Sequence, residues 1–221
     1  MLSRDNGIWL QFWRDKRTDF HLAKVNPLLS LCWPRLPPTD GNRVFVPLCG
    51  KSLDLLWLAK QGHEVIGVEL SPVAVKSFFR ENKMTPSKQK IGAFTRWRHG
   101  KISILCGDYF SLTLKDLGAV DMVYDRAALT ALPEDVRRHY VTHLKKLLPH
   151  NAKMLLLTAE DVDPMASPMQ APAVDDELMR LFCEDFHIDL IHVASEQANH
   201  ATLLNEQTEA IEYKAYLLAV K

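Results

Sequence analysis

The stretch RVFVPLCGKSLDLLWLAKQGHEVIGVELSP, residues 43–72, decides the fold. Its apolar run at 44–48 is typical of a strand that is buried on both faces, and a second such run covers 64–68. Between the two runs, residues 53–61 have the pattern of a helix, and Gly62 follows its end. A strand, a helix and a strand in this order predict a βαβ unit with two parallel strands.

The alternation of strands and helices continues along the rest of the chain. Further strands are expected at residues 102–106, 120–124, 154–157, 188–193 and 213–220. The last two runs have no convincing helix between them, which predicts an antiparallel pair at the sheet edge. We expect an α/β fold, a doubly wound and mostly parallel sheet of seven strands. This is the outline of a class I methyltransferase, a Rossmann-like sheet, but the pattern also leaves a dinucleotide-binding fold open, because both share the first half.

The first 40 residues differ from the rest of the chain. Three aromatic residues fall within residues 8–13, and a proline cluster at 34–38 precedes the first strand. We interpret residues 1–40 as an arm, partly helical, and residues 41–221 as the core of one single domain. A chain of 221 residues is long enough to bury a full hydrophobic core without disulfides or structural metals.

Composition points to a small-molecule partner. The chain has 27 Lys and Arg against 27 Asp and Glu, so its formal net charge is zero. This balance argues against nucleic acid and against an anionic membrane surface as partners. Residues 83–101 are basic and contain Phe94 and Trp97, a combination that could indicate contact with nucleic acid. Because the net charge is zero, we interpret them instead as a solvated insertion between a helix and a strand. The segment 163–172, with three prolines and two methionines, is interpreted as a mobile loop.

Cysteine usage predicts a reducing compartment. Four cysteines at positions 32, 49, 106 and 183 are widely spaced and include no C-x-x-C pair. The nine histidines form no cluster with ligand spacing, so no metal site is expected. No apolar run approaches the ~20 residues of a membrane span, and residues 1–16 lack the apolar stretch of a signal peptide. We therefore expect a cytoplasmic protein, and we expect it to be a monomer.

Candidate ligand residues follow the predicted strands, because open α/β sheets bind ligands beyond the carboxyl ends of their strands. Glu69 follows the second strand, nineteen positions after Gly50, close to the spacing at which an acid meets the hydroxyls of a ribose. The alternative is that Glu69 only caps the next helix. Only Gly50 is present in the first turn, so the chain has no G-x-G-x-x-G motif, which weakens the dinucleotide interpretation. Phe45 stands where a P-loop requires glycine, so a P-loop is excluded.

Two later strand ends also have polar side chains. Asp108 can accept from an adenine amino group and Tyr109 can cover the ring, although a turn Asp and a core-edge Tyr are equally compatible with the pattern. Arg126 can pair with a carboxylate in a bidentate manner. The alternative is an ion pair between Arg126 and its neighbour Asp125.

The sequence resembles the thiopurine S-methyltransferases, especially the bacterial ones, from about residue 8 to residue 157. The likeness is carried by these segments: Trp9-x-x-x-Trp13, Phe20-His21, VPLCGKSLD (46–54), GVELS (67–71), CGDYF (106–110) and YDRAAL (124–129). The resemblance implies S-adenosylmethionine as cofactor and a sulfur acceptor on a small aromatic ring. Matching positions imply these cofactor contacts: Trp9, Trp13, Leu48, Glu69, Asp108, Tyr109 and Arg126. On the acceptor side they imply Phe20, and we add Arg126 as the group that steers an anionic acceptor.

These observations predict an S-adenosylmethionine-dependent S-methyltransferase. Its acceptors are expected to be small aromatic or heterocyclic thiols, extending to selenium or tellurium anions. A neutral leaving group needs no acid, so no catalytic side chain is expected, and proximity supplies most of the rate. An NAD-linked oxidoreductase and a non-catalytic nucleotide-binding module remain as alternatives. The aromatic residues of the arm either form a lid over the cofactor or pack on the sheet as core, and both can hold together.

Overall fold

The computed structural model describes residues 6–18, 20–36, 42–161, 175–197 and 210–221. The interpretation of 163–172 as a mobile loop therefore concerns residues outside the described part of the chain. The described strands are β1 (Arg43–Val46), β2 (Glu64–Glu69), β3 (Ser87–Ile91), β4 (Phe94–His99), β5 (Ile102–Cys106), β6 (Met122–Arg126), β7 (Lys153–Asp161), β8 (Phe186–Gln197) and β9 (Ala210–Val220). The helices are α1 (Asn6–Arg14), α2 (Pro27–Cys32), α3 (Asp54–Lys60), α4 (Pro72–Glu81), α5 (Leu114–Leu117), α6 (Glu134–Leu147) and α7 (Asp176–Phe182). Short 3₁₀ turns η1 (Trp33–Arg35) and η2 (Tyr109–Ser111) complete the set.

The strands form one sheet in the order β3-β4-β5-β2-β1-β6-β7-β9-β8. The five strands from β5 to β7 are parallel, with β1 at their centre pairing β2 on one side and β6 on the other. β9 enters antiparallel between β7 and β8, which confirms the predicted closing pair. The predicted α/β fold class is confirmed.

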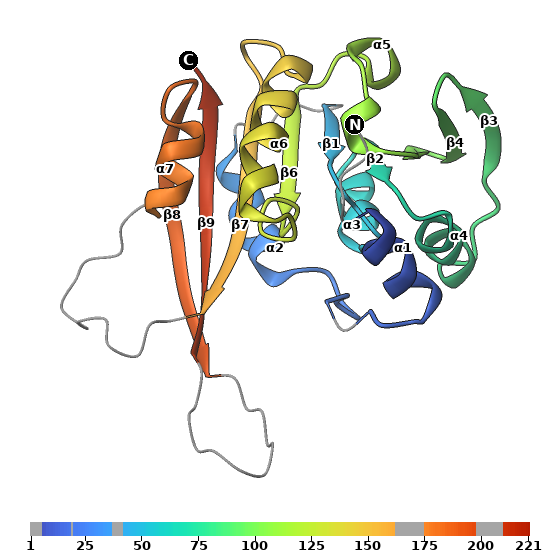
Figure 1. Cartoon of the computed structure of the whole chain (residues 1–221), viewed down its shortest axis with the longest axis horizontal. Helices are drawn as coiled ribbons and strands as arrows, with labels where there is room; N and C mark the ends of the chain where they lie inside the picture. The colour runs from blue at the N-terminus through green and yellow to red at the C-terminus, as the bar shows by residue number, and fades with distance from the viewer. Residues whose placement is uncertain (1–5, 19, 37–41, 162–174, 198–209) are drawn as a thin grey trace.

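Two hydrophobic layers lie on opposite faces of the sheet. Phe45 of β1 packs in a cluster with residues of α5, α6 and α7, whereas its neighbours Val44 and Val46 pack in a second cluster with α2, α3 and α4. Alternate residues of one strand point to opposite faces, so a run of apolar residues serves both layers. Helices therefore cover both faces of the central sheet, as Figure 1 shows.

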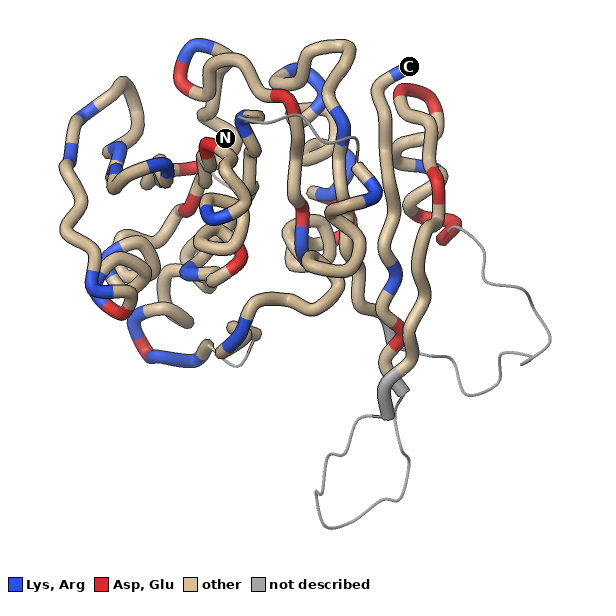
Figure 2. Tube along the Cα trace, turned by 180° about the vertical axis from the view of Figure 1, so that it is seen from behind, with Lys and Arg blue, Asp and Glu red and all other residues tan. Residues whose placement is uncertain are grey.

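The strand count was predicted wrongly, because the basic segment 83–101 is not a solvated insertion. It forms the antiparallel hairpin β3–β4, which extends the sheet beyond β5 and gives nine strands instead of seven. Side chains of β3 are almost all exposed, so the strand shows no apolar alternation in the sequence. Trp97 of β4 stacks on Phe79, and the ammonium group of Lys88 lies 3.8 Å from the centre of the Trp97 ring. Figure 2 shows Lys and Arg along this hairpin, where charge protects an exposed edge from further strand pairing.

The arm contains helices with two different roles. α2 and η1 pack onto the sheet, and Leu29 and Trp33 belong to the core cluster that also contains α3 and α4. α1 lies in front of the sheet beside α4, and it brings Trp9 and Trp13 over the carboxyl ends of the central strands. No helix in the described part of the chain is long and apolar enough to cross a membrane.

Candidate active site

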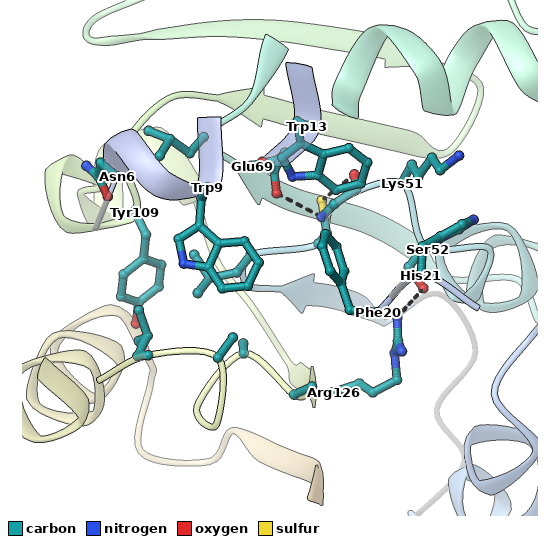
Figure 3. A pocket seen from close by; sticks show the side chains of 18 of the residues that line it. Asn6, Trp9, Trp13, Phe20, His21, Lys51, Ser52, Glu69, Tyr109 and Arg126 are labelled. Atoms are coloured by element: carbon teal, nitrogen blue, oxygen red, sulfur yellow. Dashed lines mark hydrogen bonds between the residues drawn. The ribbon is translucent and has the colours of Figure 1, made fainter. Parts of the chain in front are cut away.

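A pocket opens at the carboxyl ends of the central strands, under α1. It encloses about 1000 Å³ of space between atoms, a volume that includes open solvent at its mouth. Figure 3 shows side chains from the arm and from four strand ends directed into it. The structure brings together all residues that the sequence predicted for cofactor and acceptor: Trp9, Trp13, Phe20, Leu48, Glu69, Asp108, Tyr109 and Arg126.

The turn after β1 forms the floor of the pocket in a strained conformation. Leu48 has φ of +44° and Gly50 has φ of +53°, both in the left-handed region. A Cβ atom on Gly50 would lie 3.1 Å from Cζ2 of Trp13, so the indole packs directly against the glycine. Glycine at position 50 therefore permits both the turn and the close approach of the arm. Backbone strain of this kind is concentrated at functional sites.

Glu69 is the last residue of β2 and is 7% exposed. Its Oε2 accepts a hydrogen bond from the N–H of Gly50 at 2.9 Å, and its Oε1 accepts from the N–H of Ser71 at 2.7 Å. Ser71 caps α4, so the alternative role of Glu69 at a helix start is also present. Burial raises the pKa of Glu69 to about 7, although these two N–H groups favour the ionised form. Each carboxylate oxygen has a further lone pair, so both can still accept from a ligand hydroxyl.

Asp108 and Tyr109 line the pocket after β5. Asp108 caps η2, with Oδ1 accepting from the N–H of Phe110 at 3.1 Å. Tyr109 is 2% exposed and stacks on Tyr140, with ring centroids 4.8 Å apart. The Tyr109 hydroxyl donates to the carbonyl oxygen of Tyr140 at 3.2 Å. Tyr109 therefore contributes its ring to the pocket while its hydroxyl is bonded inside the core.

Arg126 ends β6 and reaches into the pocket, but the suggested ion pair with Asp125 is wrong. The Nε of Arg126 lies 3.3 Å from Oδ2 of Asp54, and its Nη2 lies 3.5 Å from Oγ of Ser52. Asp54 is 1% exposed. Sequence reasoning missed it as a site residue, because its partner is 72 positions away and its place in the first turn of a helix is itself favourable.

Asp125 instead anchors the loop that follows β6. It is fully buried, and it accepts from the Tyr140 hydroxyl at 2.6 Å and from the N–H of Ala128 at 3.0 Å. Burial raises the pKa of Asp125 to about 6, although the Tyr140 hydrogen bond favours the charged form. Ala127, which lines the pocket, has φ of +59°. The buried carboxylate thus helps to hold a strained segment of the pocket wall.

Three aromatic side chains of the arm form a roof over the pocket. Phe20 packs edge-on against Trp9 and against Trp13, with ring centroids 5.5 Å apart in both pairs. Trp13 is buried, whereas Phe20 is 45% exposed at the mouth. The three rings therefore line the pocket and pack on one another, and their role as a lid over a bound cofactor stays a prediction.

His21 also lines the pocket, next to Phe20. Burial lowers the pKa of His21, and the nearby charge of Lys51 lowers it further. Lys51 itself pairs with Glu81 at 2.9 Å. Among the described residues, no group of three or more His, Cys, Asp or Glu side chains is arranged to hold a metal ion.

Comparison with known proteins decides the family. Residues 4–221 match the family model named thiopurine S-methyltransferase. The chain belongs to the thiopurine S-methyltransferase family. A thiopurine S-methyltransferase of Stutzerimonas stutzeri is 54% identical over 221 residues, which are 100% of this chain and 93% of that one. One from Methylococcus capsulatus is 42% identical, over 97% of each chain.

Solved structures support the fold at much lower identity. An S-adenosylmethionine-dependent methyltransferase from Anabaena variabilis aligns with a TM-score of 0.66 at 14% identity, covering 100% of this chain and 96% of that one. A Burkholderia thailandensis N-methyltransferase, solved with S-adenosylhomocysteine, aligns with a TM-score of 0.59 at 14% identity, over 97% of this chain and 87% of that one. These likenesses confirm the class I methyltransferase fold.

Family membership confirms three predictions. The family is the predicted one, the enzyme is a methyltransferase, and its cofactor is S-adenosylmethionine. It decides against the oxidoreductase and the non-catalytic alternatives. The pocket fits this cofactor. Glu69 offers two acceptor oxygens at the end of the second strand, beside the Gly50 turn. The aromatic roof provides flat surfaces for a purine ring.

Proposed function

We propose that this pocket binds S-adenosylmethionine and transfers its methyl group to the sulfur of small aromatic or heterocyclic thiols. The observation that carries the proposal is the distribution of chemistry in the pocket. Glu69 and Asp108 supply acceptors for the ribose and the adenine, with Trp9, Trp13, Leu48 and Tyr109 around them. Phe20 lies between Trp13 and Arg126 in Figure 3, where an aromatic acceptor can contact a ring and a cation together.

Bound S-adenosylmethionine supplies a methyl group on a positively charged sulfur, and the group that leaves is a neutral thioether. The residues of this chain then have two tasks, to orient the acceptor sulfur and to exclude water. Holding two reactants in line replaces a bimolecular encounter and accounts for much of the barrier reduction. The reactive form of the acceptor is the thiolate. The guanidinium of Arg126 favours that anion near the pocket.

Soft anions other than thiolates belong to the same proposal. Small selenium or tellurium anions present a polarisable nucleophile with negative charge, and Arg126 and Lys51 both line the pocket. The four cysteines are free, which supports a reducing, cytoplasmic setting for the enzyme.

The test is a panel of acceptors with matched shapes. Purified enzyme with S-adenosylmethionine is given an aryl thiol, the corresponding phenol, a heterocyclic thione and selenite, and products are identified by mass spectrometry. We expect S-methyl products from the thiol and the thione, and none from the phenol. Arg126→Gln should slow the aryl thiol, whereas Arg98→Gln, which removes an exposed cation from β4, should not. Methylation of the phenol at the rate of the thiol, or no turnover on any sulfur or selenium acceptor, would contradict the proposal.

A further inference from the structure

A single buried carboxylate connects three parts of the site. Asp54 opens α3 and is 1% exposed. Its Oδ2 faces Nε of Arg126 at 3.3 Å and accepts from the hydroxyl of Tyr124 at 2.9 Å. Its Oδ1 accepts from the backbone N–H of Asn26 at 2.8 Å. Asp54 thereby joins the end of β6 to the arm that carries Phe20.

The contact with Asp54 constrains how Arg126 can use its donors. Nε of Arg126 forms an ion-pair contact with Oδ2 of Asp54 at 3.3 Å, and Nη2 lies at the limit of hydrogen-bond distance from Ser52. The side chain of Arg126 is 19% exposed and lines the pocket. A guanidinium is a rigid planar group, so the ion pair at Nε and the Ser52 contact at Nη2 together restrict its orientation. Asp54 therefore helps to set the plane in which Arg126 presents its remaining donors.

The Asn26 contact links the same carboxylate to the aromatic roof. Asn26 caps α2 and lies six positions after Phe20, and its N–H is bound to Asp54. The position of the chain between Phe20 and α2 thus depends on the residue that orients Arg126. Asp54 therefore contacts both Arg126 and the segment of the arm that follows Phe20.

We propose that Asp54 is a positioning residue for the methyl acceptor: it orients Arg126 toward an anionic acceptor and anchors the arm that carries Phe20. This inference rests on the proposed function of the pocket. It assigns to Asp54 a part in acceptor selectivity, not only in stability. A buried carboxylate with several partners also stabilises the fold, so the test needs a readout that stability alone does not change.

Asp54→Asn separates the two contacts. Its amide oxygen can still accept from Asn26, but its amide nitrogen faces two donors, the Arg126 guanidinium and the Tyr124 hydroxyl. The matched control is Tyr124→Phe, which removes the other donor to Oδ2 and leaves the Arg126 pair intact. Tyr124 is buried and does not line the pocket, so its loss should lower stability without changing acceptor preference.

The measurement is kcat/KM for two acceptors, an aryl thiol that carries a carboxylate and a neutral heterocyclic thione. For Asp54→Asn we expect a loss of roughly tenfold or more on the anionic acceptor, the scale of one charge-assisted contact, and less than about threefold on the thione. Tyr124→Phe should keep the wild-type ratio. Arg126→Gln combined with Asp54→Asn should be no worse on the anionic acceptor than Arg126→Gln alone, because residues that act through one another are not additive.

Equal losses on both acceptors in Asp54→Asn, or effects of the two substitutions that multiply, would overturn the inference. If Asp54→Asn does not fold, Arg126→Lys provides the decisive result, because lysine keeps the charge without the fork. We expect Arg126→Lys to lose the anionic preference, and full retention would overturn the inference. Wild-type enzyme that methylates neither acceptor would contradict the proposed function itself. A ratio that does not shift in enzyme that methylates both would contradict only the role of Asp54.

Discussion

Replacing Glu69 by Gln tests whether this carboxylate binds the ribose of the cofactor. The substitution keeps the size of the side chain and removes its charge. One amide oxygen can still accept from Gly50 or from Ser71, but the amide nitrogen must face the other backbone N–H. Glu69→Gln therefore loses one of two acceptor positions, and the remaining one is no longer charged.

The expected loss follows from the strength of hydrogen bonds to a charged group, about 1.5–3 kcal/mol each. If ribose hydroxyls bind the carboxylate, S-adenosylhomocysteine should bind Glu69→Gln roughly 10- to 150-fold more weakly than wild type, because 1.4 kcal/mol is a factor of ten. Stability should also fall, since Glu69 bonds the turn after β1 to the start of α4. A thermal melt of each sample separates the two effects.

The pH dependence gives a second signature of Glu69. Its pKa is raised by burial to about 7, so the unliganded site takes up a proton as the pH falls through 7. Binding that requires the carboxylate should weaken about tenfold per pH unit below 7 in wild type, and Glu69→Gln should lack this slope. Stability has the opposite sign: the folded protein binds this proton more tightly than the unfolded chain, so the contribution of Glu69 becomes less favourable as the pH rises from about 4.5 to 7.

Isothermal calorimetry with S-adenosylhomocysteine at pH 8 and at pH 6 measures both signatures. Glu81→Gln is the matched control, because Glu81 is an exposed acid that pairs with Lys51 and does not line the pocket. Its affinity should remain close to that of wild type. A folded Glu69→Gln protein with wild-type affinity at pH 8 would remove Glu69 from the ribose site.

Three further predictions concern the arm, the turn after β1 and the loop that follows β6. Deleting residues 1–20 should leave a folded, less stable core whose binding of S-adenosylhomocysteine, measured by calorimetry, is at least about tenfold weaker; normal methylation by the truncated protein would show that the aromatic roof only packs. Gly50→Ala places a Cβ near Trp13 at positive φ, so we expect strain of about 1–2 kcal/mol in a melt and weaker cofactor binding; an unchanged melting temperature would refute the strain argument. Tyr140→Phe removes a donor from buried Asp125 and should lower the free energy of unfolding by about 1–3 kcal/mol at pH 8. This deficit should shrink below pH 6, where Asp125 is neutral in the folded protein, and urea titrations at both pH values measure it.

Sequence reasoning found the features that depend on local pattern. The βαβ unit of residues 43–69 follows from two buried apolar runs with a helical pattern between them, and it is present. The hairpin β3–β4 was missed because an edge strand with exposed, charged side chains has no apolar alternation. Its strand character depends on pairing with β5, which no local window contains.

The part of the site at the sheet edge was predicted from the strand that each residue follows, because parallel strands end at one edge of the sheet. The aromatic residues of the arm, Trp9, Trp13 and Phe20, were implied by the family resemblance alone. What could not be predicted were contacts between distant side chains. The partner of Arg126 is Asp54 and that of Asp125 is Tyr140, and both pairs form only when a helix packs against β6. Neighbouring positions in a strand point to opposite faces, which is why Arg126 and Asp125 do not pair with each other.

The pH dependence of kcat/KM for a series of aryl thiols with different acidities tests whether this enzyme orients an already ionised sulfur and supplies no base. If it does, each profile follows the ionisation of its own acceptor and is flat above that pKa. An aliphatic thiol, with a pKa near ~8.5, should be a poor substrate at neutral pH. The contradicting result is one rising limb shared by every acceptor, with a pKa at or below about 6.5. An enzyme histidine would then be the base, and His21, at the pocket beside Phe20, would be the residue to replace first.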